Sequence, residues 1–176
     1  TSGEKGWDKG DFLEESSDVS AVVSFYGISD LMTIGEGLGE ADAKVHASPA
    51  VTEALLVHGA AFRDFPGMSI LSDKEKAMAA SPLGHVDGKE PPFFLWHGTD
   101  DKLVSPMQSA RMFEALRKAG VDVRYRLVEG AGHGDLVWNQ APVIREVTAW
   151  FAEKLGPVAP VEKRAGKTAS DGAGTL

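Results

Sequence analysis

A strand, a helix and a second strand follow one another closely in residues 93–127, and this succession constrains the fold most. The run 93–97 is short and continuously apolar, which is typical of a strand covered on both faces. A helix is predicted over 105–120, and an alternating strand follows directly over 121–127. Strands and helices joined in this way form right-handed parallel crossovers. We therefore expect an α/β protein with a mostly parallel sheet and helices on both faces.

The helix over 105–120 has the clearest local signals. Ser105 is predicted to cap it, Pro106 suits its first position, Gln108 completes a capping box, and Gly120 ends it. Its apolar positions recur at helical spacing and are expected to pack in the core: Met107, Ala110, Phe113, Leu116 and Ala119.

Three further segments complete the predicted layers. The run 19–26 is apolar and rich in β-branched residues, and it predicts a first buried strand. The alternation over 121–127 indicates a strand with one wetter face, close to a sheet edge. Residues 142–155 carry one apolar stripe and predict a final amphipathic helix.

The region between the first two strands departs from this pattern. It is expected to hold two short helices, one opened by Ser48-Pro49 and one by the capping box from Ser72 to Glu75. We interpret residues 28–90 as an excursion that lies over the functional edge of the sheet as a cap or lid, within one α/β domain spanning 1–157. The Ala-, Gly-, Lys- and Thr-rich residues 158–176 are expected to form a disordered tail.

Composition excludes several classes of function. The chain has 176 residues, a formal net charge of −8 and 18 scattered basic residues, which disfavours a nucleic-acid surface. It contains no cysteine, so disulfides, thiolate metal sites and a cysteine nucleophile are excluded. None of its apolar runs approaches the roughly 18 to 20 residues that cross a bilayer, so no membrane span is expected.

Chemically useful side chains follow the second and third strands. Asp100 and Asp101 come after the run 93–97, and His133 lies in a glycine-rich loop after the run 121–127. The carboxyl ends of parallel strands share one edge of a sheet, so these groups are expected to meet. A carboxylate beside an imidazole is the acid and base half of a Ser-His-Asp system. Physical reasoning alone leaves the choice between the two acids open.

The motifs "HGTDDKLV" and "GAGHGD", with the earlier "FYGISDL" and "ASPLGHVDGKEPPF", resemble the C-terminal half of α/β-hydrolase-fold esterases and lipases. The groups that look most similar are those of hormone-sensitive lipase, the feruloyl esterases and the prolyl-oligopeptidase-like hydrolases. The acid motif of that family, H-G-x-x-D-x-x-V, implies that Asp101 is the catalytic acid and that Asp100 occupies a variable turn position. The resemblance likewise implies His133 as the base, a small-molecule ester as substrate, and no cofactor or metal.

The nucleophile expected of this family has no match in the chain. The nearest segment, "GMSIL" around Ser69, lacks the second glycine and the preceding strand of the Gly-x-Ser-x-Gly turn. We therefore expect the serine to lie upstream of Thr1, so that this chain alone is inactive. The first strand would then have an open edge, which favours self-association.

Two alternative functions stay open from the sequence. A prolyl-oligopeptidase-type peptidase would use the same acid and base, whereas a flavodoxin-like module would hold a cation on the paired acids.

The other histidines are expected to have structural roles. His97 is predicted to be structural, with its ring hydrogen-bonded behind the acid loop. Three histidines are expected to be at the surface or bonded locally rather than metal ligands, since none has a partner at metal-ligand spacing: His46, His58 and His85.

Overall fold

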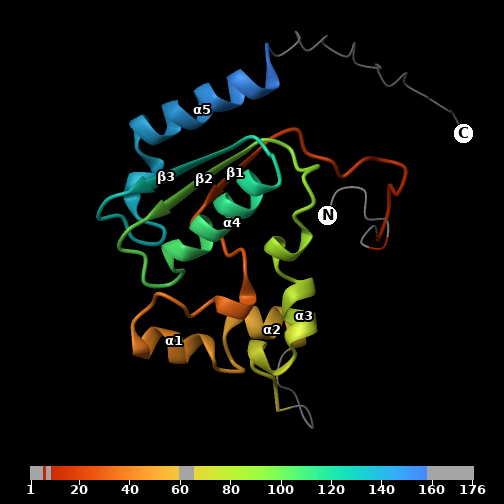
Figure 1. Cartoon of the computed structure of the whole chain (residues 1–176), viewed down its shortest axis with the longest axis vertical. Coiled ribbons are helices and arrows are strands. Elements are labelled where there is room, and N and C mark those ends of the chain that lie inside the picture. Colours follow the sequence, from red (N-terminus) through yellow and green to blue (C-terminus); the bar gives the residue numbers. More distant parts are fainter. Residues whose placement is uncertain (1–5, 7–8, 60–65, 158–176) are drawn as a thin grey trace, which may run out of the picture.

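Three parallel strands form the centre of the computed structural model (Figure 1), which describes residues 6, 9–59 and 66–157. They are β1 (Val22–Phe25), β2 (Phe93–Gly98) and β3 (Val123–Val128), in the order β1-β2-β3. Both pairings are parallel. This confirms the α/β prediction. The tail expected over 158–176 lies outside the described residues.

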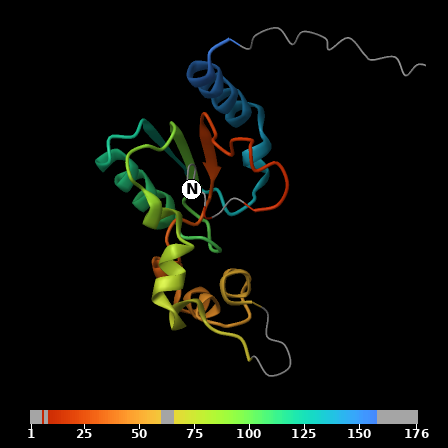
Figure 2. The ribbon, with the colours of Figure 1, turned by 90° about the vertical axis from the view of Figure 1, so that its right-hand side faces the viewer.

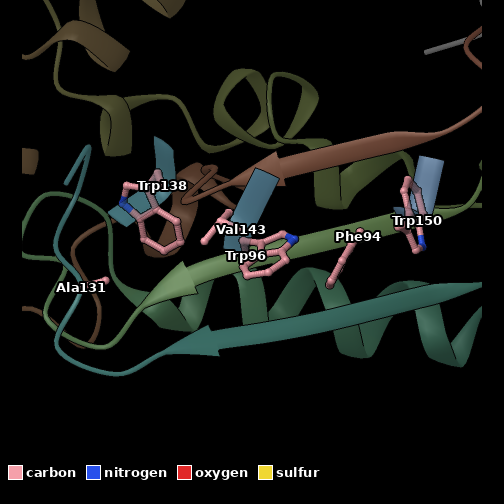
Figure 3. Packing of buried hydrophobic residues seen from close by; sticks show 6 residues of the cluster. All are labelled: Phe94, Trp96, Ala131, Trp138, Val143 and Trp150. Atoms are coloured by element: carbon pink, nitrogen blue, oxygen red, sulfur yellow. The ribbon is translucent and has the colours of Figure 1, made fainter. Parts of the chain in front are cut away.

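Helices α4 (Pro106–Lys118) and α5 (Ala141–Leu155) cover opposite faces of the sheet. Side chains of β2 alternate between them. Phe94 and Trp96 pack towards α5, whose Trp150 completes a cluster that Figure 3 shows along this face. Leu95 instead packs against Leu116 of α4. The continuous apolar run of β2 therefore arises because both of its faces are buried, as expected.

Strand β3 lies at one edge of the sheet, as its alternating pattern predicted. Val123 and Tyr125 pack into the α4 face. Arg124 donates to Glu153 of α5 at 2.7 Å, and Arg126 also pairs with a glutamate of α5, Glu146. Two ion pairs thus cover the polar face of this edge strand.

Short helices fill the region between β1 and β2. They lie beyond the carboxyl ends of the strands (Figure 2) and pack around a small cluster of their own. The elements are η2 (Leu31–Thr33), α1 (Glu40–His46), α2 (Thr52–His58), η3 (Ile70–Ser72), α3 (Lys74–Ala79) and η4 (Pro82–His85). The cluster consists of Leu31, Ile34, Ile70 and Ala77.

Two local predictions in this region were wrong in detail. Helix α2 begins at Thr52 rather than at Ser48-Pro49. The N-cap of α3 is Asp73, whose carboxylate accepts the Lys76 N–H at 3.0 Å, because the preceding Ser72 belongs to η3. Helix α1 was not predicted at all.

Gln108 does not form the capping box expected of it. Ser105 does cap α4, accepting the Met107 N–H at 3.3 Å. The buried amide of Gln108 reaches across to the segment after β1, where its Oε1 accepts the backbone N–H groups of Ser29 and Asp30 at 3.0 and 2.8 Å. Its Nε2 donates to the carbonyl of Thr33 at 3.1 Å. This side chain therefore ties the start of the excursion to α4.

Strand β1 pairs on one side only among the strands of the described residues. Its four residues carry no charge. Among residues 9–59 and 66–157, none of the helices is long and apolar enough to cross a membrane.

Candidate active site

The loop after β2 and the loop after β3 cross in direct backbone contact. The Asp100 N–H donates to the Ala131 carbonyl at 3.0 Å, and the Gly130 N–H donates to Oγ1 of Thr99 at 2.8 Å. A Cβ atom on Gly98 would lie 2.0 Å from the Ala131 carbonyl oxygen. Glycine is therefore required where β2 ends, because only it allows the two loops to approach this closely.

This crossing places Asp101 beside His133. Oδ2 of Asp101 lies 2.8 Å from Nδ1 of His133, and the Asp101 side chain is fully buried while that of His133 is 29% exposed. A carboxylate can only accept here, so Nδ1 carries the proton and Nε2 keeps its lone pair. Nε2 has no hydrogen-bond partner among the described residues. The imidazole is thus in the tautomer that a general base requires.

Both oxygens of Asp101 face N–H donors. Oδ1 accepts the backbone N–H groups of Leu103 and Val104, each at 2.9 Å. Oδ2 faces Nε2 of His97 at 3.3 Å in addition to His133. The carboxylate therefore has a fixed orientation, set by the turn that follows it and by the strand that precedes it.

His97 lies fully buried behind the acid, on the α4 side of the sheet. Its Nε2 is 2.8 Å from the Val104 carbonyl, which can only accept, so Nε2 carries the proton. Its Nδ1 is 2.7 Å from Oγ of Ser109 in α4 and accepts the hydroxyl proton. Burial lowers the pKa of His97, although the hydrogen bond to Val104 opposes this effect. The structure thus places the His97 ring behind the acid loop, as predicted.

The lowered pKa of His97 predicts a pH-dependent stability. The unfolded chain, with an ordinary histidine pKa of about 6.5, binds more protons than the folded chain just below that pH. The free energy of unfolding should therefore fall as pH falls below about 6.5. Urea titrations at several pH values should show a weaker fall for His97→Gln than for the wild type. An equal fall in both proteins would contradict the prediction, and His85→Gln serves as the control.

Tyr26 packs against His133, and Trp138 packs against Tyr26. The ring centroid of Tyr26 lies 4.3 Å from that of His133, and the ring centroid of Trp138 lies 5.4 Å from that of Tyr26. Nε1 of Trp138 donates to the Gly132 carbonyl at 2.9 Å, so this buried residue also fixes the histidine loop. Tyr26 has a φ of 44°, which is unusual for a residue other than glycine. Although His133 follows β3, its ring therefore lies at the end of β1, against Tyr26.

Other acids near the site have local structural roles. Asp100 is exposed and accepts from the Thr99 hydroxyl at 3.4 Å, without a hydrogen bond to His133. Asp30 caps η2 by accepting from Met32 N–H at 2.9 Å. Asp135 accepts the Gly132 N–H at 2.5 Å. The structure therefore brings only one of the two adjacent acids to the histidine.

Ser69 is not hydrogen-bonded to this arrangement. Its hydroxyl accepts the Leu71 N–H at 3.4 Å and caps η3, without a hydrogen bond to His133. That the nucleophile lies outside this chain stays a prediction.

His46 makes contacts that sequence reasoning missed. Its Nδ1 lies 2.5 Å from Oε1 of Glu53, and its Nε2 lies 2.9 Å from the Leu103 carbonyl. The expectation of a surface or locally bonded histidine was wrong, because these partners come from another helix and from the acid loop. No group of three or more acidic or histidine side chains able to hold a metal occurs in residues 9–59 and 66–157.

A cavity of about 450 Å³ adjoins the site. His133 and Leu103 form one wall, and Val45 and Val51 of the excursion form another. A larger hollow of about 730 Å³ lies against α4 and η4, lined by residues such as Met107 and Leu83, and contains none of the residues around His133. The smaller cavity is the one positioned to hold a reacting group.

Comparison with known proteins places the chain in a family. The BD-FAE family model matches residues 4–116, which is more than half of the chain and includes Asp101. Esterase LipQ of Mycobacterium tuberculosis is 34% identical over 122 residues, covering 68% of this chain and 25% of LipQ. The chain thus spans about a quarter of that relative.

Solved structures show the same fold. A truncated carbohydrate esterase from gut microbiota matches with a TM-score of 0.66 at 23% identity, over 84% of this chain and 46% of that one. The acylaminoacyl peptidase of Pyrococcus horikoshii matches with a TM-score of 0.57 at 18% identity, over 81% of this chain and 21% of that one. The chain belongs to the BD-FAE family, and its fold is that of the α/β-hydrolase esterases.

Proposed function

We propose that this chain supplies the acid and the base of a carboxylic ester hydrolase that works through a Ser-His-Asp triad. The observation that carries the proposal is the 2.8 Å contact between Oδ2 of Asp101 and Nδ1 of His133, which leaves Nε2 free to accept a proton. A serine hydroxyl beside Nε2 would attack the ester carbonyl, and His133 would pass the proton to the leaving alcohol. The esterase names of the sequence relatives support ester hydrolysis.

The serine is proposed to come from polypeptide preceding Thr1. His133 lies against Tyr26 at the end of β1, and the neighbouring edge of β1 is unpaired among the described strands. A further strand added beside β1 would deliver its own carboxyl end next to Nε2 of His133. The proposed serine, His133 and Asp101 would then follow one another along the carboxyl edge of the sheet, at the ends of the added strand, β1 and β2.

The excursion over 28–90 is proposed to act as a cap. The 450 Å³ cavity lies between its helices α1 and α2 and the acid loop, with His133 in the wall. An acyl or alcohol group of the substrate would occupy this space. Residues of the excursion would then select among substrates.

The cation-binding alternative is less well supported. A cation on Asp101 would have to replace the N–H donors that face both of its oxygens, and Asp100 points away into solvent. The peptidase alternative uses the same acid and base, and esterase names among the sequence relatives favour the ester substrate.

We expect the isolated chain to form no acyl-enzyme. With p-nitrophenyl acetate it should release no stoichiometric burst of p-nitrophenol, because the Ser69 hydroxyl caps η3 and has no hydrogen bond to His133. A longer polypeptide that adds the upstream serine should give the burst and cleave the acetate ester faster than a matching p-nitroanilide. Mass spectrometry of the quenched protein locates the acyl group. A stoichiometric acyl group on the isolated chain would contradict the proposal.

A further inference from the structure

His46 and Glu53 form a polar contact between the excursion and the acid loop. His46 ends α1, and Glu53 lies in the first turn of α2. Their side chains are only 14% and 11% exposed. Nδ1 of His46 lies 2.5 Å from Oε1 of Glu53, and Nε2 lies 2.9 Å from the Leu103 carbonyl oxygen. One imidazole therefore bridges α2 and the loop that follows Asp101.

The Leu103 carbonyl belongs to the same peptide group as the Val104 N–H. That N–H donates to Oδ1 of Asp101 at 2.9 Å. The carbonyl and the Glu53 carboxylate can only accept, so Nε2 of His46 donates to the carbonyl and Nδ1 donates to Glu53. A hydrogen bond to the carbonyl of a peptide polarises its N–H and strengthens the bond that this N–H donates. A continuous chain of hydrogen bonds thus runs from Glu53 through His46 and this peptide to Asp101, and from there to His133.

This contact is not explained by packing of the excursion. None of the residues of α1 is buried, and the excursion's hydrophobic cluster draws on η2, η3 and α3 instead. Val45, the residue before His46, is 57% exposed. The two hydrogen-bond partners of the His46 ring are Glu53 and the acid loop.

We propose that His46 and Glu53 are positioning residues for the catalytic acid. They fix the plane of the peptide between Leu103 and Val104, so that its N–H points at Asp101. His97 donates to the next carbonyl, that of Val104, at 2.8 Å. The excursion thereby contributes to the orientation of the acid as well as to the cavity wall. This inference rests on the proposed function for its catalytic meaning, whereas the hydrogen-bond chain is testable without any activity.

The test measures the Val104 amide by NMR in the full 176-residue chain. In His46→Ala, hydrogen exchange at Val104 should become about five- to tenfold faster relative to amides of β2, which is the equivalent of one lost hydrogen bond. Its amide proton should also shift upfield. His46→Gln, whose amide can still donate to the Leu103 carbonyl, should restore most of the protection. Glu53→Gln, which keeps the size of the side chain, should give an intermediate effect.

His85→Ala is the matched control. His85 also contacts a backbone carbonyl, that of Ala79 at 2.7 Å, but this contact stays within the excursion. Its removal should leave Val104 unchanged relative to β2. If His46→Ala leaves the Val104 exchange ratio and chemical shift as in the wild type, or if His85→Ala changes them equally, the positioning role is wrong.

Activity separates this inference from the proposed function. In a polypeptide that includes the upstream serine, His46→Ala should lower kcat about tenfold, and His46→Gln should recover most of it. If that polypeptide hydrolyses no ester, the proposed function fails while the NMR result stands. If kcat is unchanged although Val104 exchanges faster, the hydrogen-bond chain exists without a role in positioning the acid.

Discussion

Asp101→Asn should lower kcat of the serine-containing polypeptide by about 10⁴, the loss seen when the acid of a serine protease triad is replaced in this way. The carboxylate accepts the Nδ1 proton of His133 at 2.8 Å. An amide nitrogen at this position would donate instead and would favour the tautomer with the proton on Nε2. The histidine would then be unable to accept the serine proton.

The control is the neighbouring acid. Asp100→Asn removes the same charge one residue away, but Asp100 is exposed and does not reach His133. Its kcat should stay within about twofold, as expected for a surface substitution. For both variants, kcat is measured from steady-state rates with p-nitrophenyl acetate, and thermal unfolding verifies that the protein is folded. Retained activity in the first variant and lost activity in the second would reverse the assignment of the acid.

Gly98→Ala should destabilise the fold by about 3 kcal/mol or more, at the upper end of the cost of overpacking. The new Cβ would lie 2.0 Å from the Ala131 carbonyl oxygen and 2.6 Å from the carbonyl carbon. Both are backbone atoms, so a side-chain rotation cannot relieve the clash. The loops that carry Asp101 and His133 would have to separate, and any folded protein should also lose the contact between them.

Urea unfolding measures this loss, with Gly39→Ala as control. Gly39 has a φ of −62°, and its nearest non-neighbouring atom to a new Cβ would be a flexible carboxylate oxygen at 3.8 Å. Its replacement should cost no more than about 1 kcal/mol, the usual penalty for alanine at an N-cap. Similar unfolding midpoints for the two variants would show that the crossing of the loops tolerates a methyl group.

Elements with strong local patterns were predicted well from sequence. β2, α4 and α5 each carry an apolar pattern whose period matches the structure, and Pro106 sits in the first turn of α4 as predicted. Helix α1 was missed because none of its seven residues is buried, so it has no apolar stripe to detect. Its acidic first turn and basic last turn favour a helix, but they are weak signals without an apolar stripe.

Contacts between distant polar side chains could not be predicted. Gln108 bonds to Ser29 across 79 residues, and His46 reaches Leu103 across 57. Nothing in the local sequence distinguishes such residues from solvated ones. The choice of Asp101 over Asp100 likewise depended on a family motif, because the turn that buries one acid and exposes the other is set by the crossing with the histidine loop.

The two edges of the sheet differ in whether they accept another strand. Arginine side chains of β3 form ion pairs with glutamates of α5, and such charges discourage pairing with a further strand. β1 has no charged residue and offers unpaired backbone groups on its outer side. An additional strand is therefore expected at the β1 edge of the sheet and not at the β3 edge. A strand that joins, whether from the same polypeptide or another, enters beside Tyr26 and meets the histidine at its end.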